Sequence, residues 1–231
     1  MLHDRTPSQG ADLTAQQVAA IIDHTNLRPE ATRAQIVKLC DEAREFGFGS
    51  VMVNAGYVKL AHSQLKRTKV VVGAVVGFPL GATLTSAKQF EASEALRAGA
   101  REIDMVLNIG ALKSANQRLV LSDIRSLAQL VHRNKGLLKV ILETGLLTDE
   151  EKATACKLAV KAGADFVKTS TGFLGGGATA EDVALMRRAV GPKIGVKASG
   201  GIRTAADARR MIEAGATRLG SSSGVTIIRE W

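Results

Sequence analysis

Short apolar runs rich in β-branched residues alternate along the chain with longer amphipathic stretches rich in Ala, Leu, Lys and Glu. Each short run ends in polar residues or glycine, which is typical of a buried strand that leads into a loop. The pattern predicts strands at 21–25, 50–54, 69–77, 102–108, 138–143, 165–169, 193–199 and 217–222. It predicts helices between them, including 32–46, 85–98, 116–134, 149–162, 180–190 and 204–214.

The ends of three predicted helices carry the same signal, in the segments RAGAREI, KAGADFV and EAGATRL. Their glycines fit a left-handed helix C-cap, after which the next strand starts at once. Eight strand–helix repeats without a Pro- or Ser-rich linker predict a single-domain α/β fold, the (β/α)₈ TIM barrel. A doubly wound open sheet is the alternative. No GxGxxG follows the first strand and no GxxxxGK[ST] occurs, which disfavours dinucleotide and P-loop sites.

The length and composition suit one large domain with a sizeable core, since 45% of the 231 residues are hydrophobic. We expect residues 1–12 to form a disordered lead-in and residues 13–231 to form the barrel domain. No apolar run approaches the ~20 residues of a membrane helix, and the first residues lack the apolar block of a signal peptide. The two cysteines, Cys40 and Cys156, resemble buried thiols of a reducing compartment. We therefore expect a cytoplasmic protein without a membrane partner.

The net charge of +9 raises the possibility of a nucleic-acid or polyanion binder. The basic residues are dispersed, however, and aromatic residues make up only 3% of the chain, which leaves few surfaces for base stacking. The pattern favours a solvated basic surface that attracts an anionic small molecule, with no nucleic-acid partner. A polyanion binder stays the alternative from a different functional class.

Three predicted strands each carry a charged residue near the carboxyl end, in EIDMVLN, DFVKT and KIGVKAS. Side chains alternate across a strand, so Ile103 and Met105 are expected to face the helices while Asp104 faces the barrel interior. The same parity directs Lys168 and Lys197 inward. Barrel enzymes build their active sites at the carboxyl ends of the strands, so we expect these three side chains to meet in a catalytic site.

The two lysines lie on neighbouring strands, roughly 4.8 Å apart in a sheet. Two unit charges ~5 Å apart repel by about 3 kcal/mol at an effective dielectric of ~20, which would lower one lysine pKa by about two units. Only a neutral amine attacks a carbonyl, so this pair predicts a Schiff-base nucleophile, with Lys197 lowering the pKa of Lys168. The alternative is structural: each lysine extends along apolar surface to water and pairs with Asp104.

The loops after the seventh and eighth predicted strands, ASGGIRTAAD and GSSSGVTII, are rich in glycine and serine. In barrels these two loops commonly bind phosphate through backbone N–H groups. Gly200 and Gly201 would let the backbone approach an anion, and Ser222 and Ser223 would add hydroxyl donors. The alternative is ordinary turn and N-cap chemistry.

Asp23 and Thr25 end the first predicted strand, where they would form a polar proton relay at the rim, although Asp23 would equally pair with a lysine of the site. Glu143, at the end of the fifth strand, is expected to support the site from nearby. The histidines show no metal-ligand spacing, so neither a metal nor another cofactor is predicted; they are His3, His24, His62 and His132.

Seven segments together resemble the class I deoxyribose-phosphate aldolases, a family of Schiff-base enzymes, over residues 13–228. VKTSTG and VKASGG are the most specific of them. The segments are IDHTNLRPEAT, GFPLGATLTSAKQFEA, EIDMVLNIGALKS, LKVILETGLLTDEE, ADFVKTSTGF, GVKASGGIRT and RLGSSSGV. The resemblance implies a TIM barrel that needs no cofactor. It also implies reversible cleavage of 2-deoxy-D-ribose 5-phosphate to D-glyceraldehyde 3-phosphate and acetaldehyde, in deoxyribonucleoside catabolism.

The same resemblance assigns roles to individual residues. Lys168 would form the Schiff base, Lys197 would be the cation that keeps its amine neutral, and Asp104 would exchange protons through a water. Five residues match positions near the substrate phosphate: Gly172, Gly200, Gly201, Ser222 and Ser223. The partners implied are a phosphorylated sugar, aldehydes and a second copy of the chain in a homodimer.

Phe173 departs from the family pattern, because some members place a lysine after TSTG. This difference bears on phosphate binding and leaves the Lys/Asp/Lys set untouched. The closest alternative function is another phosphate-binding barrel enzyme, either a different Schiff-base aldolase or an isomerase.

Overall fold

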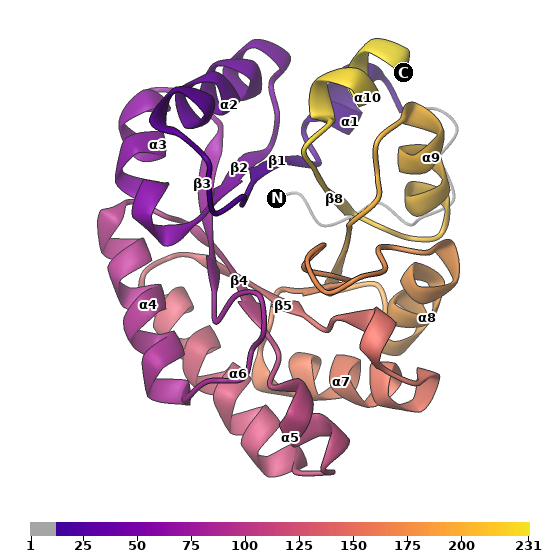
Figure 1. Cartoon of the computed structure of the whole chain (residues 1–231). Helices are drawn as coiled ribbons and strands as arrows, with labels where there is room; N and C mark the ends of the chain where they lie inside the picture. The colour runs from indigo at the N-terminus through magenta and orange to yellow at the C-terminus, as the bar shows by residue number, and fades with distance from the viewer. Residues whose placement is uncertain (1–12) are drawn as a thin grey trace.

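Eight parallel strands close into a barrel in the computed structural model, which describes residues 13–231 (Figure 1). Each strand pairs with the next one in the chain, and β8 returns to pair with β1. The strands are β1 (Ile22–Asn26), β2 (Ser50–Val53), β3 (Val71–Val76), β4 (Glu102–Val106), β5 (Leu137–Ile141), β6 (Phe166–Lys168), β7 (Gly195–Ser199) and β8 (Arg218–Ser221).

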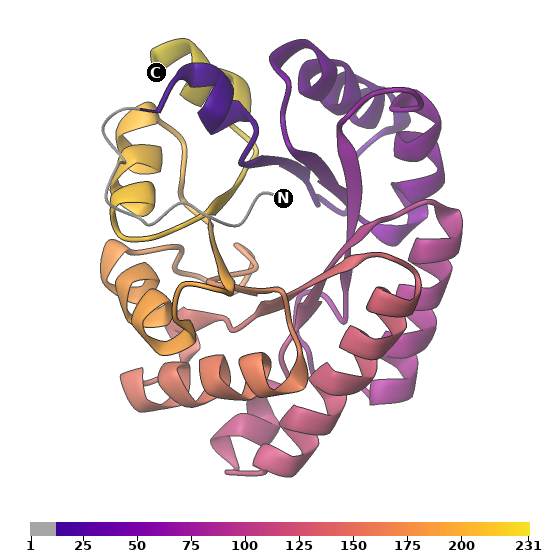
Figure 2. The same ribbon diagram turned by 180° about the vertical axis from the view of Figure 1, so that it is seen from behind.

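Helices form the outer layer around these strands, as the views from the two opposite sides of the barrel show (Figures 1 and 2). The longer ones are α2 (Arg33–Phe46), α4 (Thr85–Ala98), α6 (Gln117–Arg133), α7 (Asp149–Ala162), α8 (Ala180–Val190) and α9 (Ala205–Glu213). The shorter ones are α1 (Ala15–Ala19), η2 (Ala55–Tyr57), α3 (Val58–Gln64), α5 (Ile109–Lys113), η3 (Thr144–Leu146) and α10 (Gly224–Glu230).

The (β/α)₈ prediction is confirmed, and the doubly wound alternative is wrong, because the sheet closes. All eight predicted strands are present with ends within about two residues of the expected ones. The six predicted long helices are present as well. One detail of the strand pattern differs: Lys193, the first residue of the predicted seventh strand, lies before β7 and is exposed.

Helix α7 shows how the sequence sets the helix ends. The Thr148 hydroxyl accepts a hydrogen bond from the Glu151 N–H, and the Glu151 carboxylate accepts one from the Thr148 N–H. This capping box satisfies backbone donors that have no partner inside the helix. At the other end Gly163 adopts a left-handed φ of 92°, as the KAGADFV segment predicts.

The hydrophobic core lies between the strands and the helices. Ile103 and Met105 of β4 are fully buried in that layer, whereas Asp104, between them, faces the interior with the opposite parity. The barrel interior therefore holds polar groups that the surrounding apolar layer shields from water. Within residues 13–231, no helix is long and apolar enough to cross a membrane.

The two ends of the described chain meet. Helices α1 and α10 lie side by side in both views (Figures 1 and 2), and the indole N–H of Trp231 donates to the Leu13 carbonyl at 2.7 Å. The predicted lead-in, 1–12, lies outside the described residues, so the domain boundary at residue 13 stays a prediction.

A buried ion pair joins two outer helices to the end of β4. The Lys88 ammonium group of α4 donates to the Asp123 carboxylate of α6 at 2.6 Å and to the Val106 carbonyl at 2.9 Å. Both side chains are buried. Because Val106 follows Asp104 by two residues, this pair fixes the strand end that carries Asp104.

Replacing Lys88 with methionine is expected to destabilise the fold by about 3–5 kcal/mol, because Asp123 would become a buried charge without its partner. The measurement is urea unfolding followed by circular dichroism. The double variant K88M/D123L is the control, since replacing both charges with apolar groups costs less than removing one. A loss of stability in K88M no larger than in the double variant would contradict this account.

Candidate active site

Asp104, Lys168 and Lys197 meet inside the barrel. The Asp104 Oδ2 atom accepts hydrogen bonds from the Lys168 Nζ at 2.9 Å and from the Lys197 Nζ at 2.8 Å. The three residues come from β4, β6 and β7 and are at most 3% exposed. Lys168 and Lys197 pair directly across neighbouring strands, so their side chains leave the sheet at the same level.

A third lysine contacts the same carboxylate from β5, the strand between β4 and β6. Lys139 of β5 donates to Asp104 Oδ1 at 2.9 Å and to Glu102 Oε2 at 2.6 Å. Its side chain is fully buried. The Asp104 carboxylate is therefore surrounded by ammonium groups from β5, β6 and β7.

Asp23 and Arg218 extend the cluster toward β1 and β8. One oxygen of Asp23 accepts a hydrogen bond from Lys197, and the other accepts one from the Ser50 hydroxyl at 2.7 Å. Arg218 reaches Glu102 at 2.6 Å and Asp23 at 3.4 Å. Asp23 thus pairs with a lysine of the site, which is one of the two arrangements that the sequence left open.

The carboxylates of Asp104 and Asp23 stay ionised. Burial alone would raise the pKa of Asp104, but Lys139, Lys168 and Lys197 together hold it well below its usual range. Burial likewise opposes ionisation of Asp23, and Lys197, Arg218 and Lys139 hold its pKa below the usual range. Cations thus outweigh the desolvation of both carboxylates.

Lys168 responds to its surroundings in the opposite direction. Its pKa is lowered from 10.5 to about 8. Burial is the largest cause; Lys197 and Lys139 lower the pKa further, and Asp104 raises it. The predicted direction of the shift is therefore found, but its assigned cause needs correction. Desolvation is the largest cause, and the charge of Lys197 is a smaller one, because Asp104 lies between the two lysines and offsets their repulsion.

The protein-family model described as "DeoC/LacD family aldolase" matches residues 17–230. The chain belongs to this family of aldolases. A relative from Listeria monocytogenes, named deoxyribose-phosphate aldolase, is 59% identical over 91% of this chain and 94% of its own. A relative of the same name from Halalkalibacterium halodurans is 58% identical over 93% of this chain and 96% of its own.

A solved structure supports the same family assignment. Deoxyribose phosphate aldolase from Aeropyrum pernix, whose structure is described as a unique tetramer, superposes with a TM-score of 0.90 at 34% identity. The match covers 96% of this chain and 95% of that chain.

The predicted relay residues of this aldolase differ in their contacts. Asp23 belongs to the charged cluster, whereas the Thr25 hydroxyl donates to the Asp23 backbone carbonyl at 2.8 Å. Thr25 is half-buried and lies two residues further along the same strand face. A relay that includes Thr25 stays a prediction.

The predicted phosphate-binding residues lie in the loops after β6, β7 and β8, three neighbouring strands of the barrel. Gly200 adopts a left-handed φ of 90°, and its carbonyl accepts a hydrogen bond from the Ala178 N–H. The loop after β6 and the loop after β7 therefore lie in contact. Ser222 is exposed, and Ser223 is half-buried at the start of α10. The whole set is Gly172, Gly200, Gly201, Ser222 and Ser223; its role stays a prediction.

The sequence did not indicate Lys139, Arg218 and Glu102 as members of the site. The signal for Lys139 was a charged residue inside the apolar run LKVIL, with the parity of an inward side chain. Glu143 was expected to support the site, and its carboxylate accepts a hydrogen bond from the Thr171 N–H at 3.0 Å, in the loop after Lys168.

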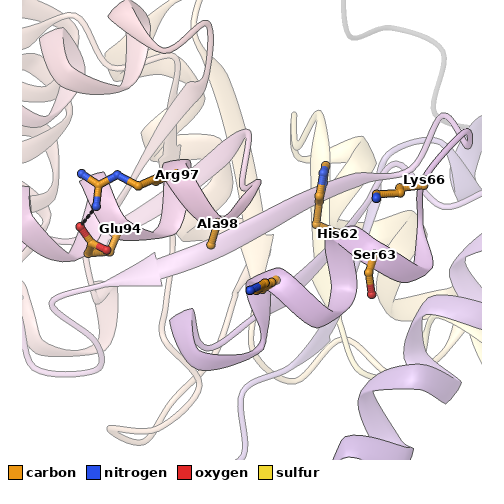
Figure 3. Close-up of a pocket in the computed structure, with 7 residues that line it drawn as sticks. His62, Ser63, Lys66, Glu94, Arg97 and Ala98 are labelled. Atoms are coloured by element: carbon orange, nitrogen blue, oxygen red, sulfur yellow. Dashed lines mark hydrogen bonds and ion pairs between the residues drawn. The ribbon is translucent and has the colours of Figure 1, made fainter.

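A hollow of about 510 Å³ lies on the outer surface between α3 and α4 (Figure 3). Its polar side chains are all exposed, and one cation, Arg97, is paired with Glu94. Among residues 13–231, no group of three or more His, Cys, Asp or Glu side chains could hold a metal ion. The interior cluster, with its buried amine of lowered pKa, is the stronger candidate for the chemistry.

Gly220 of β8 leaves room for the Lys197 side chain. A Cβ atom there would lie 2.9 Å from the Ser199 Cβ and 3.0 Å from the Lys197 Cε. We expect Gly220→Ala to displace Lys197 from Asp104 and to lower aldolase turnover by about tenfold or more while the fold persists. The measurement is steady-state kinetics together with circular dichroism.

Gly110→Ala is the matched control for this substitution. Gly110 lies in α5, and the nearest atom to an added Cβ is the Asn108 Oδ1 at 3.8 Å, an ordinary contact. Turnover in this variant should stay at the wild-type level. Equal activity in both glycine variants would show that a Cβ atom at position 220 does not displace Lys197, contrary to this account.

Proposed function

We propose that this chain is a class I aldolase that cleaves 2-deoxy-D-ribose 5-phosphate reversibly to D-glyceraldehyde 3-phosphate and acetaldehyde, through a Schiff base on Lys168. One observation carries the mechanism: the Lys168 amine is buried, its pKa is lowered to about 8, and it contacts the Asp104 carboxylate. The names of relatives that are 58–59% identical support the choice of substrate.

The proposed reaction begins when the neutral Lys168 amine attacks the C1 aldehyde of the open-chain sugar. The carbinolamine loses water and becomes a protonated imine. Loss of the proton from the C3 hydroxyl then breaks the C2–C3 bond. The bond electrons pass to the imine as an enamine, and C3 leaves as the aldehyde of glyceraldehyde 3-phosphate. Protonation of the enamine at C2 and hydrolysis release acetaldehyde and restore the amine.

Asp104 would exchange the protons of these steps. Its Oδ2 atom contacts both Lys168 and Lys197, so a proton that leaves the substrate reaches a carboxylate already held by cations. Positioned acid–base groups of this kind typically contribute about 10²–10⁴-fold. The protonated imine itself accepts the electrons of the broken bond, so the proposed chemistry calls for no cofactor.

An apolar cluster on the β1–β3 side of the interior favours a two-carbon donor without polar groups. Leu27, Met52 and Val75 are buried together there, with Phe78 packed against them. Val75 pairs with Asp104 across neighbouring strands, so the apolar side begins next to the proton-transfer group. A methyl group suits this surface better than a hydroxyl or a phosphate does.

The loops after β6, β7 and β8 would hold the phosphate. Those loops are glycine-rich and lie at the carboxyl ends of the strands, where barrel enzymes commonly bind phosphate. The phosphate contacts would position the sugar chain without touching the bond that breaks.

Two further parts of the proposal concern the setting of the enzyme. Both cysteines are free and buried, and burial raises the pKa of each thiol, which suits a reducing cytoplasm. We also propose a homodimer, and the tetramer described for the Aeropyrum pernix relative is the alternative assembly. Light scattering of the purified chain distinguishes the two.

The test combines cleavage and labelling. With EDTA present, the protein should release glyceraldehyde 3-phosphate from 2-deoxy-D-ribose 5-phosphate, and borohydride with acetaldehyde should add an ethyl group to Lys168. Lys168→Met should lower cleavage below about one thousandth of the wild-type rate. Lys157→Met, at an exposed lysine of α7, is the control and should leave the rate unchanged.

Several outcomes would overturn the proposal. Labelling at another lysine would remove Lys168 as the nucleophile. Labelling of Lys168 by dihydroxyacetone phosphate, without cleavage of deoxyribose phosphate, would favour a different Schiff-base aldolase. Loss of cleavage in EDTA that added metal restores would contradict the cofactor-free mechanism.

A further inference from the structure

Among residues 13–231, one connected network of charged side chains in the barrel interior contains one more basic group than acidic groups. Seven ionisable side chains form a continuous network of contacts there. The acids are Asp23, Glu102 and Asp104, and the bases are Lys139, Lys168, Lys197 and Arg218. A buried net charge is costly, so the network makes loss of a proton from one of its bases easier.

The contacts decide which base that is. Lys139 lies within 4 Å of three carboxylates, at 2.6, 2.9 and 3.6 Å. Lys197 contacts two carboxylates, those of Asp23 and Asp104. Lys168 contacts one, that of Asp104, within the described chain. Removing the proton from Lys168 therefore breaks the fewest ion pairs.

Arg218 is the one base of this set that keeps its proton under all ordinary conditions. Its guanidinium group spans two acids, with Nη2 at 2.6 Å from Glu102 and Nη1 at 3.4 Å from Asp23. It also lies over the Phe166 ring, 5.8 Å from the centroid. Burial opposes its charge, but the neighbouring carboxylates raise its pKa. Arg218 thus supplies a permanent positive charge to the network, next to Glu102 and Asp23.

We propose that Arg218 is a positioning residue that acts through Glu102 and Asp23 to make the interior lose one proton more easily, and that this proton is the one on Lys168. The inference rests on the proposed function, since it concerns the amine assigned there as the nucleophile. It assigns a role in the reaction to Arg218 and Glu102. Within the described chain, neither residue forms an ion pair with Lys168.

Loss of the Arg218 charge would change the balance of the network. Three acids would then face three lysines, so the neutral interior would hold all three lysines protonated. Asp23 and Glu102 would draw Lys197 and Lys139 toward themselves, because each would have lost a cationic partner. Asp104 would keep Lys168 as its main partner and would hold the proton on that amine.

Charged groups of β4, β5 and β7 act directly on the Lys168 amine, and each of them affects the pH at which it loses its proton. Asp104 of β4 favours the charged amine. Lys139 of β5 and Lys197 of β7 favour the neutral amine. Asp23, Glu102 and Arg218 act on Lys168 through these three contacts.

The experiment measures how fast acetaldehyde and cyanoborohydride alkylate Lys168 between about pH 6 and pH 10, by peptide mass spectrometry. In Arg218→Met the acidic limb of this profile should move up by about one pH unit, which lowers the rate at pH 7 about tenfold. Arg218→Lys keeps a cation in place and should retain most of the wild-type profile. Glu102→Gln removes an acid and should move the limb to lower pH.

The double variant R218M/E102Q separates charge balance from structural damage. It restores one excess base, with two acids and three lysines, so its acidic limb should return toward the wild-type position. Circular dichroism shows which variants fold. If Arg218→Met does not fold, the pH profile of Glu102→Gln alone tests the proposal.

The outcomes are distinguishable from failure of the proposed function. If wild-type protein is not alkylated at Lys168, the nucleophile assignment itself is wrong. If wild-type protein is alkylated there, but Arg218→Met or Glu102→Gln folds with an unchanged pH profile, the role of Arg218 is overturned and the aldolase mechanism stands.

Discussion

The Asp104 carboxylate is the contact on which the candidate site depends. It accepts hydrogen bonds from lysines of β5, β6 and β7, and it stays ionised because those cations outweigh the cost of its burial. A carboxylate held in this way does two things at once. It fixes the Lys168 amine in position, and in the proposed mechanism it exchanges protons beside that amine. The same contact also raises the pKa of Lys168, so burial and the other cations must offset it before the amine becomes nucleophilic.

The barrel provides the conditions for this balance. Closure of the sheet directs alternate side chains of every strand into one small volume, while the apolar layer of Ile103 and Met105 excludes water from behind. Space inside is limited, and glycine supplies part of it: Gly220 leaves room for Lys197, and Gly195 leaves room for the Phe166 ring, which lies beneath Arg218. The fold thus concentrates charged groups that an open sheet would leave separate.

Much of this architecture could be predicted from the sequence, because its signals are local. Strand runs, capping residues and the Ala-Gly stops locate eight strands and six long helices, and strand parity alone brings Asp104, Lys168 and Lys197 to one side. The short helices, such as α5 and α10, contain too few residues for a helical period to be recognised.

Apart from the pairing of Asp23 with a lysine, the network around the three residues could not be predicted, because it depends on which strands become neighbours and on how deep each side chain lies. Glu102 and Arg218 are 116 residues apart in the chain, yet they form an ion pair once β8 closes the barrel. The cause of the Lys168 pKa shift was misassigned for the same reason, since the degree of burial is a property of the whole fold. Likewise, nothing in the sequence around Lys88 indicates that its partner is Asp123 on another helix.

The central claim is that about a tenth of Lys168 is a free amine at pH 7, far more than for an ordinary lysine, because the closed interior holds it away from water among charged groups. The most direct measurement is an NMR titration of lysine side chains labelled at Cε, with the Lys168 resonance assigned by its loss in Lys168→Arg. The account predicts a titration midpoint at about 8. A midpoint near the ordinary lysine value of ~10.4 would contradict it.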